Sequence, residues 1–117
     1  MTYLDLFYNR LRGNVILIIA ANLSKLTTLD LRNDILTNNI SPAISNLSQL
    51  TSLFLENNML NGSIPKTITN LKNLKVISFS NNNLIGTIPR SIGKLHSLQT
   101  LLLDSNKLSG EIPYSIH

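Results

Sequence analysis

Residues 47–68, LSQLTSLFLENNMLNGSIPKTI, decide the fold, because their pattern recurs on both sides of them. Written as a spacing, the pattern is L-x-x-L-x-x-L-x-L-x-x-N-x-L-x-G-x-I-P-x-x-I. Leu55, Phe79 and Leu103 occupy the same place in three successive copies and lie 24 residues apart. A period between about 20 and 50 residues is typical of solenoid proteins. The sequence therefore predicts a stack of similar coils.

Five copies of the pattern cover the chain, and we interpret them as one repeat domain without caps. Their bounds are residues 1–22, 23–46, 47–70, 71–94 and 95–117. The last three copies keep the asparagine, the glycine and the isoleucine-proline pair. In the second copy, Asp34 stands for the asparagine, Asn38 for the glycine and Ser41 for the proline. We therefore expect the second copy to be the less regular part of the stack.

The first copy departs further, because residues 15–21 form an apolar run, VILIIAA, with Ile16 in place of the proline. Such a run favours aggregation when it is exposed. It is a degenerate connecting segment, a patch against another chain or the mark of a truncated gene. We favour the first interpretation.

Each copy contains one short strand with one buried face. In L-x-L the two leucines alternate with polar or variable residues, which is typical of a half-buried strand. Leu53 and Leu55 are thus predicted to point inward, and Ser52, Phe54 and Glu56 outward. Stacked copies would place these strands side by side in one parallel sheet.

The asparagines and glycines of the pattern have structural roles in this interpretation. Asn58, Asn82 and Asn106 follow their strands at the same position, and an amide can both donate to and accept from backbone groups of its own and the neighbouring coil. Glycine permits a sharp bend, and proline fixes an extended segment after it. We therefore expect a ladder of asparagines along one edge of the sheet.

The L-x-G-x-I-P signature resembles the plant-type leucine-rich repeat, and the resemblance covers essentially the whole chain. It implies an α/β-type solenoid: a right-handed coil with a parallel sheet on its concave face and irregular or 3-10 segments on its convex face. Proteins with this signature include the extracellular parts of receptor-like kinases and receptor-like proteins, and polygalacturonase-inhibiting proteins. They bind peptides, other proteins or co-receptors through the concave face and loops. The resemblance thus implies an extracellular or cell-surface location, and a plasma-membrane location for a full-length receptor.

Enzyme chemistry has little support in the sequence. Asp5, Asp30 and Asp104 recur on strands, but no Ser/His/Asp or Cys/His arrangement and no metal-spaced cluster accompanies them. His96 lies on a connecting segment among a lysine and serines. The glycines occur once per copy, at the bend, and do not form a phosphate-binding loop. We therefore expect no catalysis, no metal and no cofactor.

The formal net charge of +4 raises the question of nucleic-acid binding. Five of the basic residues fall between the predicted strands: Lys25, Lys66, Lys72, Arg90 and Lys94. Acidic residues fall on the strands, so the predicted sheet is slightly acidic. We therefore expect a solvated basic outer face and no nucleic-acid partner.

The sequence also lacks the usual signs of export and membrane insertion. The N-terminal residues alternate polar and apolar and do not read as a signal peptide. The longest apolar run is well short of the roughly 20 residues of a membrane span. We therefore expect neither in this chain.

The predicted outward positions of the strands supply the candidate binding residues. Phe54, Val76 and Leu102 form an apolar diagonal with Glu56 and Asp104 beside it. Asp30 and Arg32 occupy equivalent outward positions in the second copy. Apolar anchors with a polar rim are typical of binding hot spots, although scattered apolar residues are also common on protein surfaces. These seven residues are our candidates for contacts with a protein or peptide ligand, and a co-receptor is a further candidate partner.

Sequons for N-glycosylation occur at Asn22, Asn39, Asn46 and Asn61. Asn22 and Asn46 share one phase on the connecting segments, where a glycan would leave the concave face accessible. In a secreted protein we expect glycans on Asn22, Asn46 and Asn61, with Asn46 the best acceptor. Asn39 is the worst because Pro42 follows its serine.

The sequence thus predicts a recognition module of a receptor-like protein or kinase. Two alternatives remain open: an inhibitor of wall-degrading enzymes that resembles the polygalacturonase inhibitors, and a truncated fragment without independent function. Neither the ligand nor the length of the complete protein follows from the residues.

Overall fold

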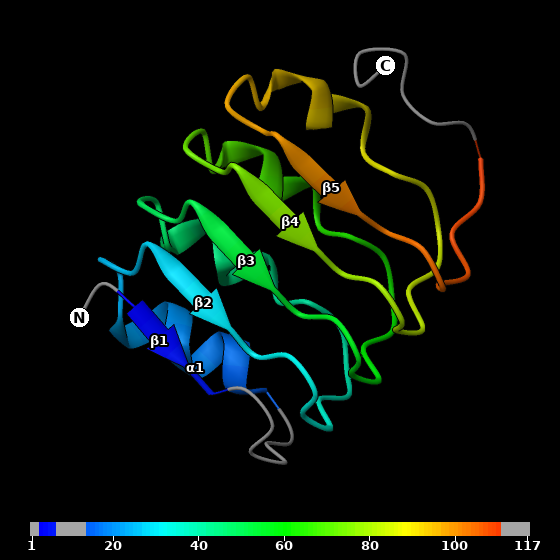
Figure 1. The fold of residues 1–117 in the computed structure, drawn as a ribbon, viewed down its shortest axis with the longest axis horizontal. Coiled ribbons are helices and arrows are strands. Elements are labelled where there is room, and N and C mark those ends of the chain that lie inside the picture. Colours follow the sequence, from blue (N-terminus) through cyan, green and yellow to red (C-terminus); the bar gives the residue numbers. More distant parts are fainter. Residues whose placement is uncertain (1–2, 7–13, 111–117) are drawn as a thin grey trace.

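The computed structural model describes residues 3–6 and 14–110. Five short strands form one parallel sheet in chain order, as Figure 1 shows. The strands are β1 (Tyr3–Asp5), β2 (Thr28–Asp30), β3 (Ser52–Phe54), β4 (Val76–Ser78) and β5 (Thr100–Leu102). The predicted right-handed solenoid with a parallel sheet on its concave side is confirmed. Residues 1–2 and 111–117, the outer limits of the first and last predicted copies, lie outside the described residues.

The 24-residue period sets the register of the sheet. Leu29 pairs with Leu53, and Leu53 pairs with Ile77, so residues at the same place in the pattern become neighbours across strands. Leu53 and Leu55 are fully buried, while Phe54 and Glu56 are partly exposed. The alternation predicted from the leucine spacing is therefore confirmed.

Short helical segments lie on the side of the coil opposite the sheet. They connect the end of one strand to the start of the next. Three of them are 3-10 turns of five residues each: η1 (Pro42–Asn46), η2 (Lys66–Asn70) and η3 (Arg90–Lys94). A proline at or just before the first residue starts each turn, because its fixed φ suits that position and its missing N–H is not needed there. The predicted 3-10 segments are confirmed in these coils.

The first coil differs, because its connecting segment is the α-helix α1 (Val15–Asn22). No proline or glycine interrupts these eight residues, so i to i−4 hydrogen bonds can form, and the N–H of Leu23 donates to the carbonyl of Ile19 at 2.9 Å. Ile16, Ile19 and Ala20 are buried at the helical spacing i, i+3, i+4. The apolar run thus lies at the place of a connecting segment, in a helical form that the sequence did not predict.

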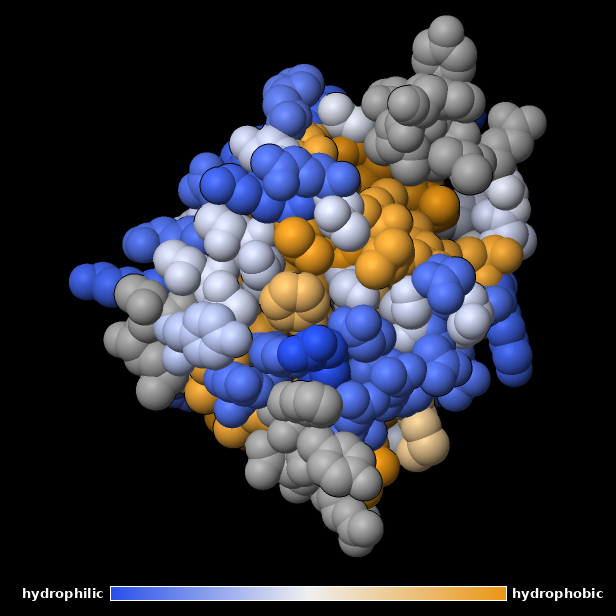
Figure 2. Space-filling view, viewed as in Figure 1, coloured by the Kyte–Doolittle hydropathy of each residue, from blue (hydrophilic) through white to orange (hydrophobic). Residues whose placement is uncertain are grey.

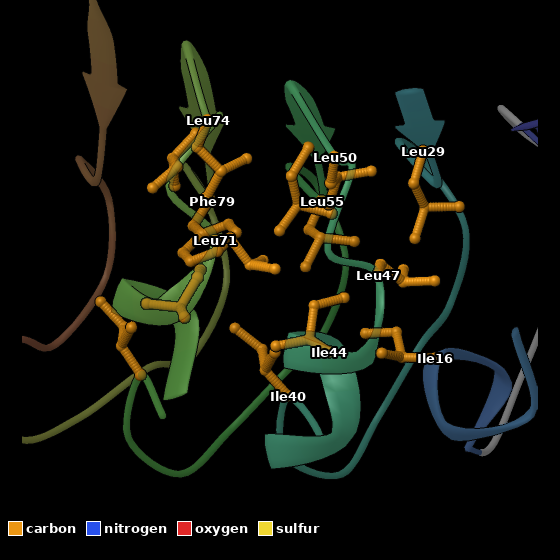
Figure 3. Packing of buried hydrophobic residues seen from close by; sticks show 14 of the residues in the cluster. Ile16, Leu29, Ile40, Ile44, Leu47, Leu50, Leu55, Leu71, Leu74 and Phe79 are labelled. Atoms are coloured by element: carbon orange, nitrogen blue, oxygen red, sulfur yellow. The ribbon is translucent and has the colours of Figure 1, made fainter. Parts of the chain in front are cut away.

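One hydrophobic core fills the space between the sheet and the connecting segments. Figure 3 shows Leu29, Leu55 and Phe79 from the strand side facing Ile16 and Ile44 from the helical side. Burying one such side chain contributes about 1.5–3 kcal/mol. Because each coil packs against its neighbours, the stack of coils supplies most of the stability.

The predicted asparagine ladder is present. The side-chain oxygen of Asn82 accepts from the N–H of Leu60 at 3.1 Å. Its amide group donates to the carbonyls of Leu55 and Phe79, at 3.0 Å each. Asn58 and Asn106 make the equivalent contacts one coil earlier and one coil later. Each asparagine therefore joins two coils through backbone groups that would otherwise be buried without partners.

Backbone conformation explains two other columns of the pattern. Gly86 has a φ of 80°, and a Cβ there would lie 3.3 Å from the Cβ of Ser63 in the preceding coil. Asn38, which replaces this glycine in the second copy, also has a positive φ, of 66°. Asparagine tolerates this left-handed region better than other non-glycine residues, so the second copy keeps the bend.

Candidate functional site

The outward side chains of the strands form three rows across the sheet, which together we call the sheet face. Members of a row are neighbours because they share one place in the repeat. The first row is Tyr3, Thr28, Ser52, Val76 and Thr100, and the second is Asp5, Asp30, Phe54, Ser78 and Leu102. The third is Arg32, Glu56, Ser80 and Asp104, where the backbone ladder continues beyond the strands. The seven predicted binding residues all lie in these rows.

Asp30 does not present an exposed carboxylate, contrary to our expectation. The residue is 1% exposed, and its carboxylate accepts two hydrogen bonds from Arg32. The distances are 2.9 Å from Nε to Oδ1 and 2.7 Å from Nη2 to Oδ2. The backbone N–H of Arg32 also donates to Oδ1, at 3.1 Å. Asp30 is therefore a positioning group for Arg32, since a buried carboxylate needs a partner of this kind.

Arg32 covers Asp30 and extends to the next strand. Its guanidinium carbon lies 5.2 Å from the ring centroid of Phe54, within the range of a cation–π contact. The hydrogen bonds with Asp30 raise the pKa of the Arg32 guanidinium, and the charges of Glu56 and Asp5 add to this effect. The side chain of Arg32 remains 38% exposed. Arg32 is thus a fixed, permanently charged group at the edge of the sheet face.

An apolar surface lies beside this charged corner. Val76 and Phe54 are partly exposed, and Leu102 is 44% exposed. Ser78 lies between Phe54 and Leu102 in the second row but is only 1% exposed. Figure 2 shows apolar surface gathered over β4 and β5 on this side of the molecule. Phe54 and Leu102 share the second row and Val76 lies in the first, so the three apolar residues form an exposed cluster and not the expected diagonal.

Two carboxylates lie in the third row, on either side of Ser80. Asp104 is exposed, and one of its oxygens, Oδ1, accepts a hydrogen bond from Ser80 Oγ at 2.5 Å. Glu56, on the other side of Ser80, is partly exposed, but its Oε1 is buried and has no hydrogen-bond partner among the described residues. We did not single out Ser80 from the sequence, although its place in the repeat, opposite Asp104, would have indicated the contact.

The charge distribution follows the prediction. On the described part of the sheet face, Asp5, Asp30, Glu56 and Asp104 accompany one basic residue, Arg32. The five basic residues predicted between the strands are exposed elsewhere: Lys25, Lys66, Lys72, Arg90 and Lys94. The sheet face is thus acidic although the whole chain is basic.

The predicted glycosylation residues all lie away from the sheet face, and all are exposed. Asn22 ends α1, where its side-chain amide donates to the carbonyl of Ile18 at 2.8 Å. Asn46 ends η1. Asn61 precedes the bend at Gly62, and Asn39 lies in the preceding coil. Glycans on these residues would leave the sheet face accessible.

The sequence did not reveal a groove of about 620 Å³ along the L-x-G-x-I-P segments. Residues of three coils line it, and these include Asn39, Ser63 and Thr87 at one place of the repeat. No sheet-face residue lines it. The groove is lined by the bend segments of successive coils. It therefore results from the stacking of the repeats.

Residues 3–6 and 14–110 offer neither a candidate metal site nor a candidate membrane span. Among these residues no group of three histidine, cysteine, aspartate or glutamate side chains is placed to hold a metal ion. None of the helices described is both long and apolar enough to cross a bilayer.

Comparison with known proteins identifies the repeat. The model of the leucine rich repeat family matches residues 48–108. None of the curated proteins compared with the chain matches it in sequence. Among solved structures, the TDR receptor is 40% identical with a TM-score of 0.95, over 99% of this chain and 20% of that receptor.

Two further structures widen the comparison. The Arabidopsis receptor kinase HAESA, solved with the peptide hormone IDA and the co-receptor SERK1, is 38% identical with a TM-score of 0.91, over 99% of this chain and 20% of that one. A plant ice-binding protein is 36% identical with a TM-score of 0.77, over 80% of this chain and 31% of that one. The chain thus spans about a fifth of the length of these receptors. With its matching repeats, coil geometry and asparagine ladder, the chain belongs to the leucine-rich repeat family and resembles a segment of the plant receptor ectodomains.

Proposed function

We propose that this chain is a non-enzymatic recognition module of a plant receptor-like kinase or receptor-like protein, and that it binds a protein or peptide through the sheet face. The complete protein would act at the cell surface. A co-receptor is a further expected partner, by analogy with the HAESA complex, which contains one. Glycans on Asn22, Asn46 and Asn61 would cover the other sides of the coil.

The observation that carries this proposal is the apolar surface of Phe54, Val76 and Leu102 beside fixed charged groups. Leu102 is 44% exposed at the end of β5, on the outward side of the sheet. Arg32 is held in place by Asp30 and by the Phe54 ring, so it loses little side-chain freedom when a ligand binds. Apolar anchors within a polar rim are the usual composition of a binding centre.

The size of the sheet face limits the contact that this segment makes. Five strands about 4.8 Å apart, each exposing roughly 10 Å of length, offer a strip on the order of 200–300 Å². A standard protein interface uses about 800 Å² per partner. The segment therefore contributes part of a larger contact, or it binds a short peptide alone.

Selection of peptides tests the proposal. A library of random dodecapeptides displayed on phage is selected on the immobilised 117-residue chain, and each selected peptide is then measured against Phe54→Ala and Leu102→Ala variants. We expect selected peptides to lose binding to both variants. Peptides that bind the variants as well as they bind the unchanged chain would contradict recognition by the sheet face.

A further inference from the structure

The two carboxylates of the third row differ from Asp30 in one respect. The charge of Asp30 is matched by Arg32, which forms a two-bond pair with it. Glu56 and Asp104 form no ion pair with a basic residue among residues 3–6 and 14–110, although the charge of Glu56 also acts on Arg32 at the neighbouring place of the row. Glu56 follows β3 and Asp104 follows β5, and Ser80 lies between them. Their backbones are therefore about 10 Å apart, twice the spacing of neighbouring strands. Two carboxylates at this separation attract a cation.

Two buried polar atoms lie in the same part of the sheet face. Glu56 Oε1 is an acceptor, and Ser78 Oγ is both a donor and an acceptor, and neither has a hydrogen-bond partner among the described residues. Ser78 is 1% exposed and points to the sheet face, because its neighbour Ile77 points into the core. Buried polar atoms without partners are uncommon and costly. Each of these atoms can take a hydrogen bond that the described residues do not supply.

The apolar surface lies one step along the strands from the carboxylates. Phe54 precedes Glu56 by two residues, and Leu102 precedes Asp104 by two residues, so each pair is separated by about 6.6–6.8 Å. Lysine and arginine combine an apolar stem with a charged head, and they lay the stem along apolar surface. The sheet face offers surface for both parts at the matching distance.

We propose that the sheet face selects a cationic peptide segment. A lysine or arginine of the ligand lays its methylene groups against Phe54 and Leu102 and donates to the carboxylates of Glu56 and Asp104. A ligand with an acidic residue at this place is rejected, because it would meet two like charges. This inference rests on the proposed function and adds the ligand class to it.

Three matched peptides test the inference on the isotope-labelled 117-residue chain by NMR titration. The probe is acetyl-Gly-Leu-Gly-Lys-Gly-amide, in which an extended backbone places the leucine and lysine side chains about 6.8 Å apart, on the same side. Norleucine replaces the lysine in the second peptide and glutamate in the third. The amide signals of β3, β4 and β5 report binding at the sheet face.

We expect the lysine peptide to bind roughly three- to tenfold more tightly than the norleucine peptide at low salt, and the difference to shrink as salt is added. The glutamate peptide should bind least. A Glu56→Gln, Asp104→Asn variant keeps the shape of both side chains and removes both charges, so the lysine and norleucine peptides should bind it equally. The Asp104→Asn variant alone changes only an exposed residue and should lose part of the preference.

Two results would overturn the inference. If the norleucine peptide perturbs the same amides at the same concentration as the lysine peptide, the cation preference is wrong and recognition by the sheet face stands. If the lysine peptide perturbs no amide of β3, β4 or β5 up to its solubility limit, the cationic ligand class is wrong. Failure of the proposed function itself would appear separately, as selected dodecapeptides that ignore Phe54→Ala and Leu102→Ala.

Discussion

Arg32 and Asp30 form a two-bond ion pair in which one member is 1% exposed and the other is 38% exposed at its side chain. The pair joins two neighbouring coils indirectly, because the Arg32 guanidinium also lies over the Phe54 ring of the next strand. A buried carboxylate thus determines where a charged group of the sheet face stands.

Removing the arginine from this pair should destabilise the fold. In an Arg32→Ala variant the carboxylate of Asp30 loses both its charged partner and the side chain that covers it, so water can reach it. We expect a loss of about 1–3 kcal/mol in the free energy of unfolding, less than for a fully buried pair, because Arg32 is partly solvent-exposed. Urea unfolding followed by circular dichroism measures this difference.

The same ion pair predicts how the stability loss in Arg32→Ala depends on pH. Because Asp30 raises the pKa of Arg32, the contribution of the arginine is fully present below the ordinary arginine pKa and is lost only as the pH rises through the raised value. The penalty of Arg32→Ala should therefore be the same at about pH 6 and about pH 9. A penalty that disappears at the higher pH would contradict the assignment.

The asparagine ladder predicts different costs at two equivalent positions. Asn82→Ala leaves the buried Leu60 N–H without its side-chain partner and removes one of two amide donors from the Leu55 carbonyl, which still accepts from Asn58, so we expect a loss of about 1–3 kcal/mol. Asn106 makes the same contacts but is more exposed, and water can replace part of them. Asn106→Ala should therefore cost about half as much. If both variants lose the same free energy of unfolding in urea, burial does not determine how much each asparagine contributes to stability.

Ser105 is the last described member of a column whose earlier members, 24 residues apart, are asparagines with positive φ. Asn57 and Asn81 have φ values of 61° and 60°, and the Asn81 amide donates to the Asn57 side-chain oxygen at 2.8 Å. Ser105 has a φ of 57° in the same column. Ser105→Asn should stabilise the fold by about 0.5–1 kcal/mol, because asparagine tolerates this conformation better and can extend the side-chain contact. A Ser105→Ala variant, which gains neither benefit, is the matched control and should not be stabilised.

Replacing an exposed isoleucine of α1 with lysine should make the protein more soluble. Ile18 is 63% exposed on α1, whereas its neighbour Ile19 is 6% exposed. Ile18→Lys should reduce concentration-dependent light scattering and change the free energy of unfolding by less than about 0.5 kcal/mol. Ile19→Lys places a charge in the core and should destabilise the fold by several kcal/mol, roughly 3 or more. Unchanged scattering in Ile18→Lys would show that α1 does not drive association.

The period of the sequence predicted the sheet, its register and most of the core. Leu29, Leu53 and Ile77 share one place in the repeat, and equal spacing alone makes them neighbours across strands. The ladder residue Asn82 was predictable for the same reason. These features depend on local patterns that every coil repeats, so they can be read from one copy.

Features that depend on contacts between unlike residues could not be predicted. Alternation placed Asp30 outward correctly, but its burial depends on how the Arg32 side chain folds over it. Ser78 is buried because larger residues, Phe54 and Leu102, stand on either side of it in the row. Residues Val15–Asn22 form an α-helix because no proline interrupts them and because Ile16 and Ile19 pack into the core. An apolar composition alone does not distinguish such a helix from an extended segment.

The affinity of one selected dodecapeptide for three chains tests the central claim, recognition through the sheet face, most directly. The chains are the unchanged protein, Leu102→Ala on the sheet face and Ile85→Ala, a matched truncation of an exposed residue outside it. We predict that Leu102→Ala raises the dissociation constant by about tenfold or more, as for a hot-spot residue, and that Ile85→Ala leaves it unchanged. A dissociation constant that rises with Ile85→Ala and not with Leu102→Ala would contradict the account.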